Sequence, residues 1–157
     1  MTTHRAAFAS HSPDATAHLA TSLGAVLKAG DCLLLSGGIG AGKSHFARAL
    51  IQSRLSEPED VPSPTFTLVQ TYDLPECELW HADLYRLGAP DQIIELGLLD
   101  AFETAITLIE WPDRLQDLTP SHALHLDIQD SNHDDTRQIT LTWTDPKWSD
   151  VMARVVT

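Results

Sequence analysis

A glycine-rich segment that ends in a lysine and a serine is the part of this sequence best suited to chemistry. Gly37, Gly42, Lys43 and Ser44 match the pattern G-x-x-x-x-G-K-[ST] of a phosphate-binding loop, or P-loop. Glycines lack the Cβ atoms that would keep the backbone away from a phosphate, and they tolerate positive φ angles. The lysine would reach the β- and γ-phosphates of a nucleotide, and the serine hydroxyl would ligate Mg²⁺.

The residues on both sides of the loop have the pattern that a P-loop needs. An apolar run at 32–35 predicts a buried strand, and apolar residues from Phe46 to Ile51 predict a helix that runs to about Leu55. The positive end of that helix dipole would add to the inward-pointing N–H groups of the loop. The alternative is a glycine-rich turn that caps the helix and binds nothing. The residues that we expect to bind nucleotide are Gly38, Ile39, Gly40, Ala41, Gly42, Lys43, Ser44 and His45.

Two carboxylates follow strand-like segments and are candidates for holding a metal ion. The apolar run 105–109 ends in Glu110, which is typical of a Walker B element, where a buried strand brings an acid beside the phosphates. Asp83 lies in a second alternating segment, 78–85, and His81 two residues earlier shares its face. A lone acid at a strand end is more often only solvated, but the P-loop favours the metal-binding interpretation of Glu110. Which acid lies nearer the metal stays open.

A polar, proline-rich connection at 56–64 leads to Thr65. A threonine hydroxyl between the P-loop helix and the next strand occupies the place of the nucleotide-sensing switch in many P-loop proteins. The alternative is a turn that is stiffened by its prolines and capped by the threonine. The sequence favours the two interpretations equally.

Hydrophobic periodicity predicts an α/β domain around these residues. A serine-proline-aspartate sequence at 12–14 begins a helix, whose apolar spacing continues to a stop at Gly30. Segments 122–129 and 138–144 alternate like strands and should pair antiparallel, because the turn between them is short. The remaining expected elements are an edge strand at 5–10, strands at 67–72 and 78–85, a helix over 90–99 broken at Gly97, and a C-terminal amphipathic helix over 146–156.

Composition limits the classes of protein that fit. A chain of 157 residues with 43% hydrophobic content is one domain with a real core. The net charge is −12, whereas a protein that holds nucleic acid by itself normally presents a basic face. The sequence begins without a signal-peptide pattern, and no apolar run approaches the roughly 20 residues of a membrane span. The two cysteines form no framework, so we expect a cytoplasmic protein.

Four segments together resemble the TsaE (YjeE) family, the P-loop ATPases of bacterial tRNA threonylcarbamoyladenosine synthesis. They are residues 37–44, 63–66, 81–87 and 109–112, and the sequences H-x-D-L-Y-R and E-W-P are distinctive. The resemblance implies a single domain with a mixed parallel and antiparallel sheet flanked by helices. It also implies a monomer that works with TsaB and TsaD, whose complex modifies the adenosine beside the anticodon. ATP hydrolysis would reset that complex, and tRNA would be touched only indirectly.

The same resemblance assigns roles to single residues. Lys43 binds phosphate, and Ser44 and Glu110 hold Mg²⁺. Thr65 senses the γ-phosphate. Asp83 is our candidate for orienting the attacking water, directly or through Thr65.

The resemblance also bears on four further residues. Trp111 is similar to a residue that the family needs for activity. The family often has a second threonine where this chain has His45, so one phosphate contact is lost there. The family also tends to place an arginine after the strand at 122–129, where this chain offers Arg137, and Thr16 would lie near the base.

Three other functions remain to be weighed against an ATPase. A small-molecule kinase is the main alternative, although it needs an acceptor pocket and several lid arginines, and the seven arginines here are spread along the chain. A small GTPase would need an [NT]-K-x-D segment, and no lysine of this chain has an aspartate two residues later. A nucleotide sensor without catalysis is disfavoured by the intact Lys43, Ser44 and Glu110.

Overall fold

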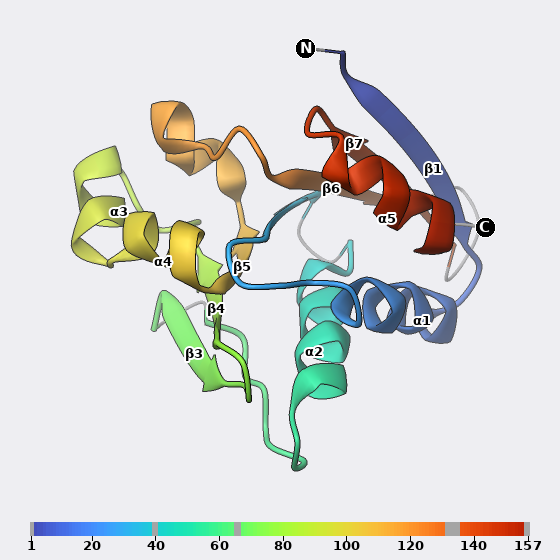
Figure 1. Ribbon diagram of the computed structural model, residues 1–157, viewed down its shortest axis with the longest axis horizontal. Helices are drawn as coiled ribbons and strands as arrows, with labels where there is room; N and C mark the ends of the chain where they lie inside the picture. The colour runs from blue at the N-terminus through green and yellow to red at the C-terminus, as the bar shows by residue number, and fades with distance from the viewer. Residues whose placement is uncertain (1, 39–40, 65–66, 131–135, 156–157) are drawn as a thin grey trace.

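A mixed β-sheet forms the centre of the computed structural model, which describes residues 2–38, 41–64, 67–130 and 136–155 (Figure 1). The strands are β1 (His4–Ser10), β2 (Cys32–Ser36), β3 (Val69–Asp73), β4 (Glu78–Asp83), β5 (Ile106–Glu110), β6 (Leu124–Asp130) and β7 (Arg137–Trp143). Across the described residues their order is β1-β7-β6-β2-β5-β4-β3. The predicted edge strand near the N-terminus and the predicted α/β class are confirmed.

The strands beside the P-loop run parallel, so their carboxyl ends meet at one edge of the sheet. Strand β2 pairs parallel with both β5 and β6, and β4 pairs parallel with β5. The other three pairs, β1 with β7, β6 with β7 and β3 with β4, are antiparallel. In this register Leu35 lies opposite Glu110, and Glu110 lies opposite Asp83. The segment that follows β2 and both candidate acids therefore reach the same edge.

Helices cover both faces of the sheet, which explains why β2 and β5 are almost continuously apolar. One face carries α1 (Pro13–Gly24), α2 (Lys43–Arg54) and α5 (Lys147–Val155), and the other carries α3 (Pro90–Glu95), α4 (Leu98–Thr104) and the 3₁₀ helix η1 (Pro112–Leu118) (Figure 1). Alternate residues of β2 serve the two cores. Leu33 and Leu35 pack with Phe46 and Leu50 of α2, whereas Leu34 packs on the opposite side.

Helix α1 begins as predicted but ends earlier. The Ser12 side chain accepts a hydrogen bond from the N–H of Ala15 at 3.0 Å, as expected of a helix cap. The helix ends at Gly24 rather than near Gly30. Beyond it, the Asp31 carboxylate accepts the N–H of Lys28 at 2.8 Å, and the Asp31 N–H donates to the Lys28 carbonyl. A local side-chain bond thus replaces the helical pattern and turns the chain into β2.

Most other predicted elements are present with shifted bounds. Gly97 separates α3 from α4 at φ +85°, as expected of a helix breaker, but α4 continues to Thr104. The antiparallel pairing of β6 with β7 is confirmed, and so is the C-terminal helix. The 3₁₀ helix η1 was not predicted.

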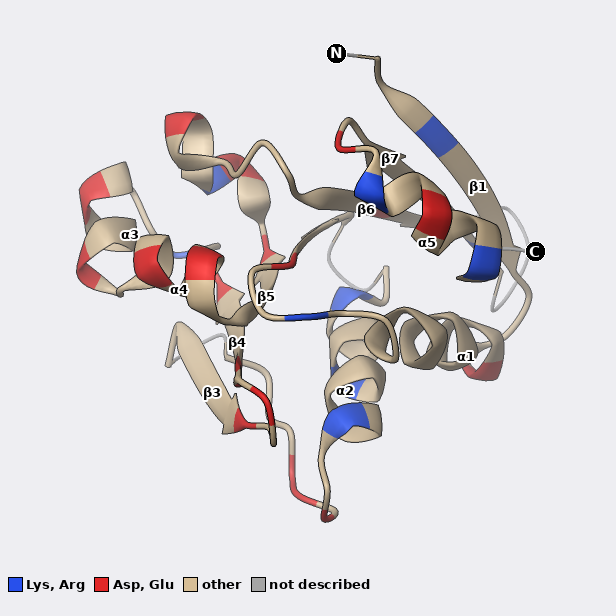
Figure 2. Ribbon diagram, in the orientation of Figure 1, with Lys and Arg blue, Asp and Glu red and all other residues tan. Residues whose placement is uncertain are grey.

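Burial and charge agree with the sequence-based expectations. Cys32 is fully buried, and burial raises the pKa of its thiol to about 12. Basic residues are distributed over β1, α2, α5 and several loops, with acidic residues between them (Figure 2). Among the described helices, none is long and apolar enough to cross a membrane.

Candidate active site

The P-loop joins β2 to α2 and places the start of that helix at the edge of the sheet. Gly42 precedes the helix at φ +111°, a conformation that favours glycine. Its carbonyl accepts the N–H of Phe46 at 2.9 Å, which is the first bond of the helix, and the N–H of Ala41 donates to the carbonyl of Gly38 at 3.1 Å. The N–H groups at 43–45 have no acceptor within the helix, so they can face an anion at this end.

Gly37 is required by close packing against β6. It lies at φ +139°, and a Cβ added there would be 2.3 Å from the carbonyl oxygen of Ile128. The neighbouring Gly38 has no positive φ, and a Cβ there would meet nothing within 4 Å among the described residues. Two adjacent glycines therefore serve different purposes: the first lets the backbone pass β6, and the second leaves open space beside the loop.

This difference gives a matched pair of substitutions. We expect Gly37→Ala to lower the free energy of unfolding by about 2 kcal/mol or more, because its φ angle and the Ile128 carbonyl both oppose a side chain. Gly38→Ala should lower it by less than about 1 kcal/mol. Urea unfolding of both variants without nucleotide measures the difference. Equal losses of stability would contradict the packing described here.

The Lys43 ammonium lies against the loop that would enclose a phosphate. Its Nζ donates to the carbonyls of Gly37 at 2.5 Å and Gly38 at 3.3 Å, and it lies 4.1 Å from the centroid of the Trp111 ring. The side chain is only 6% exposed. Burial lowers the pKa of Lys43, while the nearby negative charges of Glu110 and Asp83 act in the opposite direction. The charge is thus held in place by dipoles, an indole and two acids.

Trp111 is positioned by an unusual backbone conformation. It directly follows Glu110 and has φ 58° and ψ 54°, in the left-handed region that residues with side chains rarely adopt. Its ring packs against Tyr85 with centroids 4.9 Å apart, and its face is the one that approaches Lys43. The predicted role of Trp111 in activity stays a prediction, and the structure shows that its ring contacts the P-loop lysine.

The two acids differ in what they touch. Ser44 Oγ donates to Glu110 Oε1 at 3.2 Å, and the Glu110 side chain is buried with the residue only 2% exposed. The Asp83 carboxylate accepts the N–H of Tyr85 at 2.9 Å and is 5% exposed. The sequence left the choice between these acids open. In the structure Glu110 is the acid that is bonded to the P-loop serine.

The available ligands fit a magnesium ion that is shared with phosphates. Mg²⁺ prefers oxygen ligands and is usually bound by one or two carboxylates together with substrate phosphates. Ser44, Glu110 and Asp83 offer a hydroxyl and two carboxylates. A serine hydroxyl can donate to Glu110 and still use a lone pair for a cation. Within the described part of the chain, no cluster of three or more His, Cys, Asp or Glu side chains could hold a metal alone.

Arg137 reaches the P-loop from the start of β7. Its Nε donates to the carbonyl of Ala41 at 3.0 Å and lies 3.1 Å from Asp130 Oδ1. Arg137 and Ala41 are 96 positions apart in the sequence, so only the folded sheet brings them together. The expected nucleotide contact of Arg137 stays a prediction, and its observed contact is with the backbone of the P-loop at Ala41.

The remaining predicted residues contact other parts of the chain or fall outside the described residues. His45 Nε2 lies 3.0 Å from the carbonyl oxygen of Pro13, so its ring contacts the start of α1. The buried Thr16 hydroxyl lies 2.5 Å from the hydroxyl of Ser10. Contacts of either residue with nucleotide stay predictions. The predicted site residues that fall outside the described residues are Ile39, Gly40 and Thr65.

His81 is the residue whose role sequence reasoning missed. Its Nε2 lies 2.7 Å from Glu110 Oε2, and its side chain is only 2% exposed. Strand alternation already placed it on the face of Asp83, which was the available signal. The partner could not be read from the sequence, because it lies 29 residues away.

Comparison with known proteins agrees with this geometry. Residues 10–139 match the family model described as threonylcarbamoyl adenosine biosynthesis protein TsaE. The chain is 38% identical to the TsaE protein of Rickettsia bellii over 119 residues, which are 76% of this chain and 83% of that one. It is 34% identical to the Bacillus subtilis protein of the same name over 131 residues, or 83% of this chain and 80% of that one.

The fold also matches a solved structure. A crystal structure of YdiB from Bacillus subtilis superposes with a TM-score of 0.82 at 25% sequence identity. The match covers 99% of this chain and 97% of that one, so it includes the whole sheet and its helices. The sequence and structure comparisons together show that this chain belongs to the TsaE family.

Proposed function

We propose that this chain binds ATP with Mg²⁺ at the P-loop and hydrolyses the bond to the γ-phosphate during tRNA threonylcarbamoyladenosine biosynthesis. Membership of the TsaE family supports the role in that pathway. The observation that supports the chemistry best is the hydrogen bond between Ser44 and the buried Glu110 beside the Lys43 ammonium. It joins the residue predicted to ligate the metal to the acid expected at the end of a Walker B strand.

The chain's own groups would stabilise the reaction by charge and position. The Lys43 ammonium and the N–H groups at the start of α2 would neutralise charge on the phosphate oxygens as the bond to the leaving ADP oxygen breaks. A bound Mg²⁺ would supply further positive charge there, with Ser44 and Glu110 holding it. Asp83, which lies beside Glu110 in the register, would orient the attacking water, directly or through Thr65. The products would be ADP and inorganic phosphate.

The biological setting follows from the family. The chain would act as a cytoplasmic monomer that joins TsaB and TsaD, and its hydrolysis of ATP would reset their complex between turnovers. The net charge of −12 disfavours independent tRNA binding, because tRNA is itself strongly acidic.

Phosphate release from ATP tests this function. The purified chain should release phosphate slowly in the presence of Mg²⁺, faster after addition of TsaB and TsaD, and not at all with excess EDTA. Slow turnover alone is expected because the sequence offers no clear arginine finger other than Arg86 to act on the transition state. The same rate with and without partners would contradict a partner-dependent switch. A stable phosphorylated small molecule in place of free phosphate would support the kinase alternative.

A further inference from the structure

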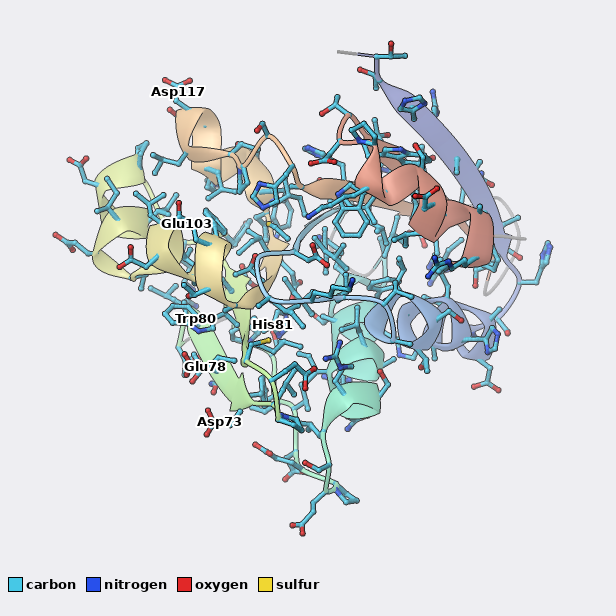
Figure 3. All side chains as sticks on the ribbon, viewed as in Figure 1. Asp73, Glu78, Trp80, His81, Glu103 and Asp117 are labelled. Atoms are coloured by element: carbon cyan, nitrogen blue, oxygen red, sulfur yellow. The ribbon has the colours of Figure 1, made fainter. Side chains whose placement is uncertain are left out.

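The buried ring of His81 lies between the sheet and the P-loop helix. It comes from β4 and is on the side of that strand that faces α2 (Figure 3). The parallel register puts His81 opposite Leu108 and Asp83 opposite Glu110, so these side chains point to the same face. Leu108 belongs to the core that packs under α2. His81 is therefore part of the floor beneath the active site.

The direction of its hydrogen bond follows from the role proposed for Glu110. A carboxylate that holds a metal ion is ionised and only accepts hydrogen bonds, so in that role the 2.7 Å contact has His81 Nε2 donating its N–H to Glu110 Oε2. The other ring nitrogen, Nδ1, is buried and has no hydrogen-bond partner among the residues that the structure describes. A histidine that served only the core would be expected to satisfy both nitrogens. Here the polar contact of the ring is directed at Glu110.

This contact determines how the two carboxylate oxygens of Glu110 are used. The terminal torsion of a glutamate is broad, so packing alone sets it weakly. A short, charge-assisted bond from His81 fixes Oε2, and Oε1 then becomes the oxygen nearer to Ser44, at 3.2 Å against 3.5 Å for Oε2. The Glu110 carboxylate thus lies between His81 of β4 and Ser44 of the P-loop.

We infer that His81 is a positioning residue, whose Nε2–H holds the Glu110 carboxylate so that Oε1 is presented to Ser44 and to a cation bound there. The inference rests on the proposed function, because it assigns His81 a role toward the Mg-nucleotide. Groups that hydrogen-bond to metal-binding carboxylates commonly change metal affinity by about 10–100-fold when removed. A merely structural histidine would affect stability without this dependence on a donor.

Two substitutions with side chains of similar length distinguish a positioning role from a purely structural one. His81→Gln keeps an N–H donor near the position of Nε2, whereas His81→Met fills similar space without a donor. We expect His81→Met to weaken the gain in nucleotide affinity that Mg²⁺ provides by about 10-fold or more, and His81→Gln to retain most of it. Binding of a fluorescent ATP analogue is measured with Mg²⁺ and with EDTA. Affinity in EDTA should be nearly the same in all three proteins.

Urea unfolding of the same proteins controls for folding. If both variants lose stability and Mg-dependent affinity in parallel, His81 has only a structural role and the inference is overturned. Nitrogen-15 NMR of the wild-type ring offers a second readout without substitution or ligand. The inference requires the proton on Nε2 in the folded chain; a ring protonated on Nδ1 and bare at Nε2 would overturn it.

Comparing wild type with His81→Met distinguishes failure of the positioning role from failure of the proposed function. If wild-type protein shows no gain in nucleotide affinity with Mg²⁺, the proposed function and the inference fail together. If wild type shows the gain and His81→Met shows the same gain, only the positioning role fails.

Discussion

Replacing Lys43 with methionine should reduce ATP hydrolysis by about 100-fold or more. Methionine keeps the length of the side chain but removes the ammonium that lies at the carbonyls of Gly37 and Gly38. Loss of one well-placed group that stabilises transition-state charge typically costs about 10²–10³-fold in rate. The variant should also bind ATP more weakly, because the same charge attracts the β- and γ-phosphates. Phosphate release and binding of a fluorescent nucleotide measure the two effects.

Lys147 provides the matched control. Its ammonium donates to the Asp31 carboxylate at 2.6 Å beside α5, away from the P-loop. Lys147→Met removes the same charge and should leave hydrolysis within about 2-fold, because distant sites act independently. Equal losses in the two variants would show that net charge, rather than the position of Lys43, governs the rate. An unchanged rate in Lys43→Met would contradict the proposed phosphate site.

Replacing Glu110 with glutamine should slow ATP hydrolysis about as much as Lys43→Met does, and should weaken nucleotide binding less. The substitution preserves the size of a buried side chain that contacts Ser44 and His81 but removes its negative charge. We expect hydrolysis to fall by about 100-fold and Mg-dependent nucleotide affinity to fall by about 10-fold or more. Nucleotide affinity measured in EDTA should change little, since the phosphate contacts of the loop remain.

Two further variants test whether the effect is specific to Glu110. Glu103→Gln removes a carboxylate on the exposed part of α4 and should change neither the rate of hydrolysis nor the Mg-dependent nucleotide affinity. Asp83→Asn tests the second acid of the site. If Asp83 orients water, its variant should lose turnover while keeping most of the affinity that Mg²⁺ adds. A larger loss of Mg-dependent affinity in Asp83→Asn than in Glu110→Gln would reverse the assignment of the two acids.

The parts of the fold that follow from local pattern could be predicted from the sequence. The helix over 43–54 was expected because an apolar strand, a glycine-rich loop and a helical periodicity follow one another directly. Glu110 and Asp83 were expected as competing candidates for one metal site, and the parallel pairing of β4 with β5 is what places them opposite each other. The early end of α1 could not be foreseen, since the carbonyls of Gly24 and Leu27 there accept hydrogen bonds from Arg54, which is 30 and 27 residues away.

The contacts that complete the site join distant parts of the chain. Arg137 meets Ala41 across 96 residues, and His81 meets Glu110 across 29. No periodicity encodes such pairs, because they depend on strand order and register. Trp111 is a related case, since its left-handed backbone conformation is visible only in the folded chain. Residue type and spacing thus predicted the candidate residues, while the fold shows which of them are in contact.

A crystal structure with Mg²⁺ and a non-hydrolysable ATP analogue tests the central claim most directly. We expect phosphates enclosed by residues 37–44 with Lys43 Nζ bonded to them, and an ion ligated by Ser44 with Glu110 in contact directly or through one water. Crystals grown at saturating analogue in which the loop holds no phosphate, or in which Glu110 faces away from the ion, would contradict it.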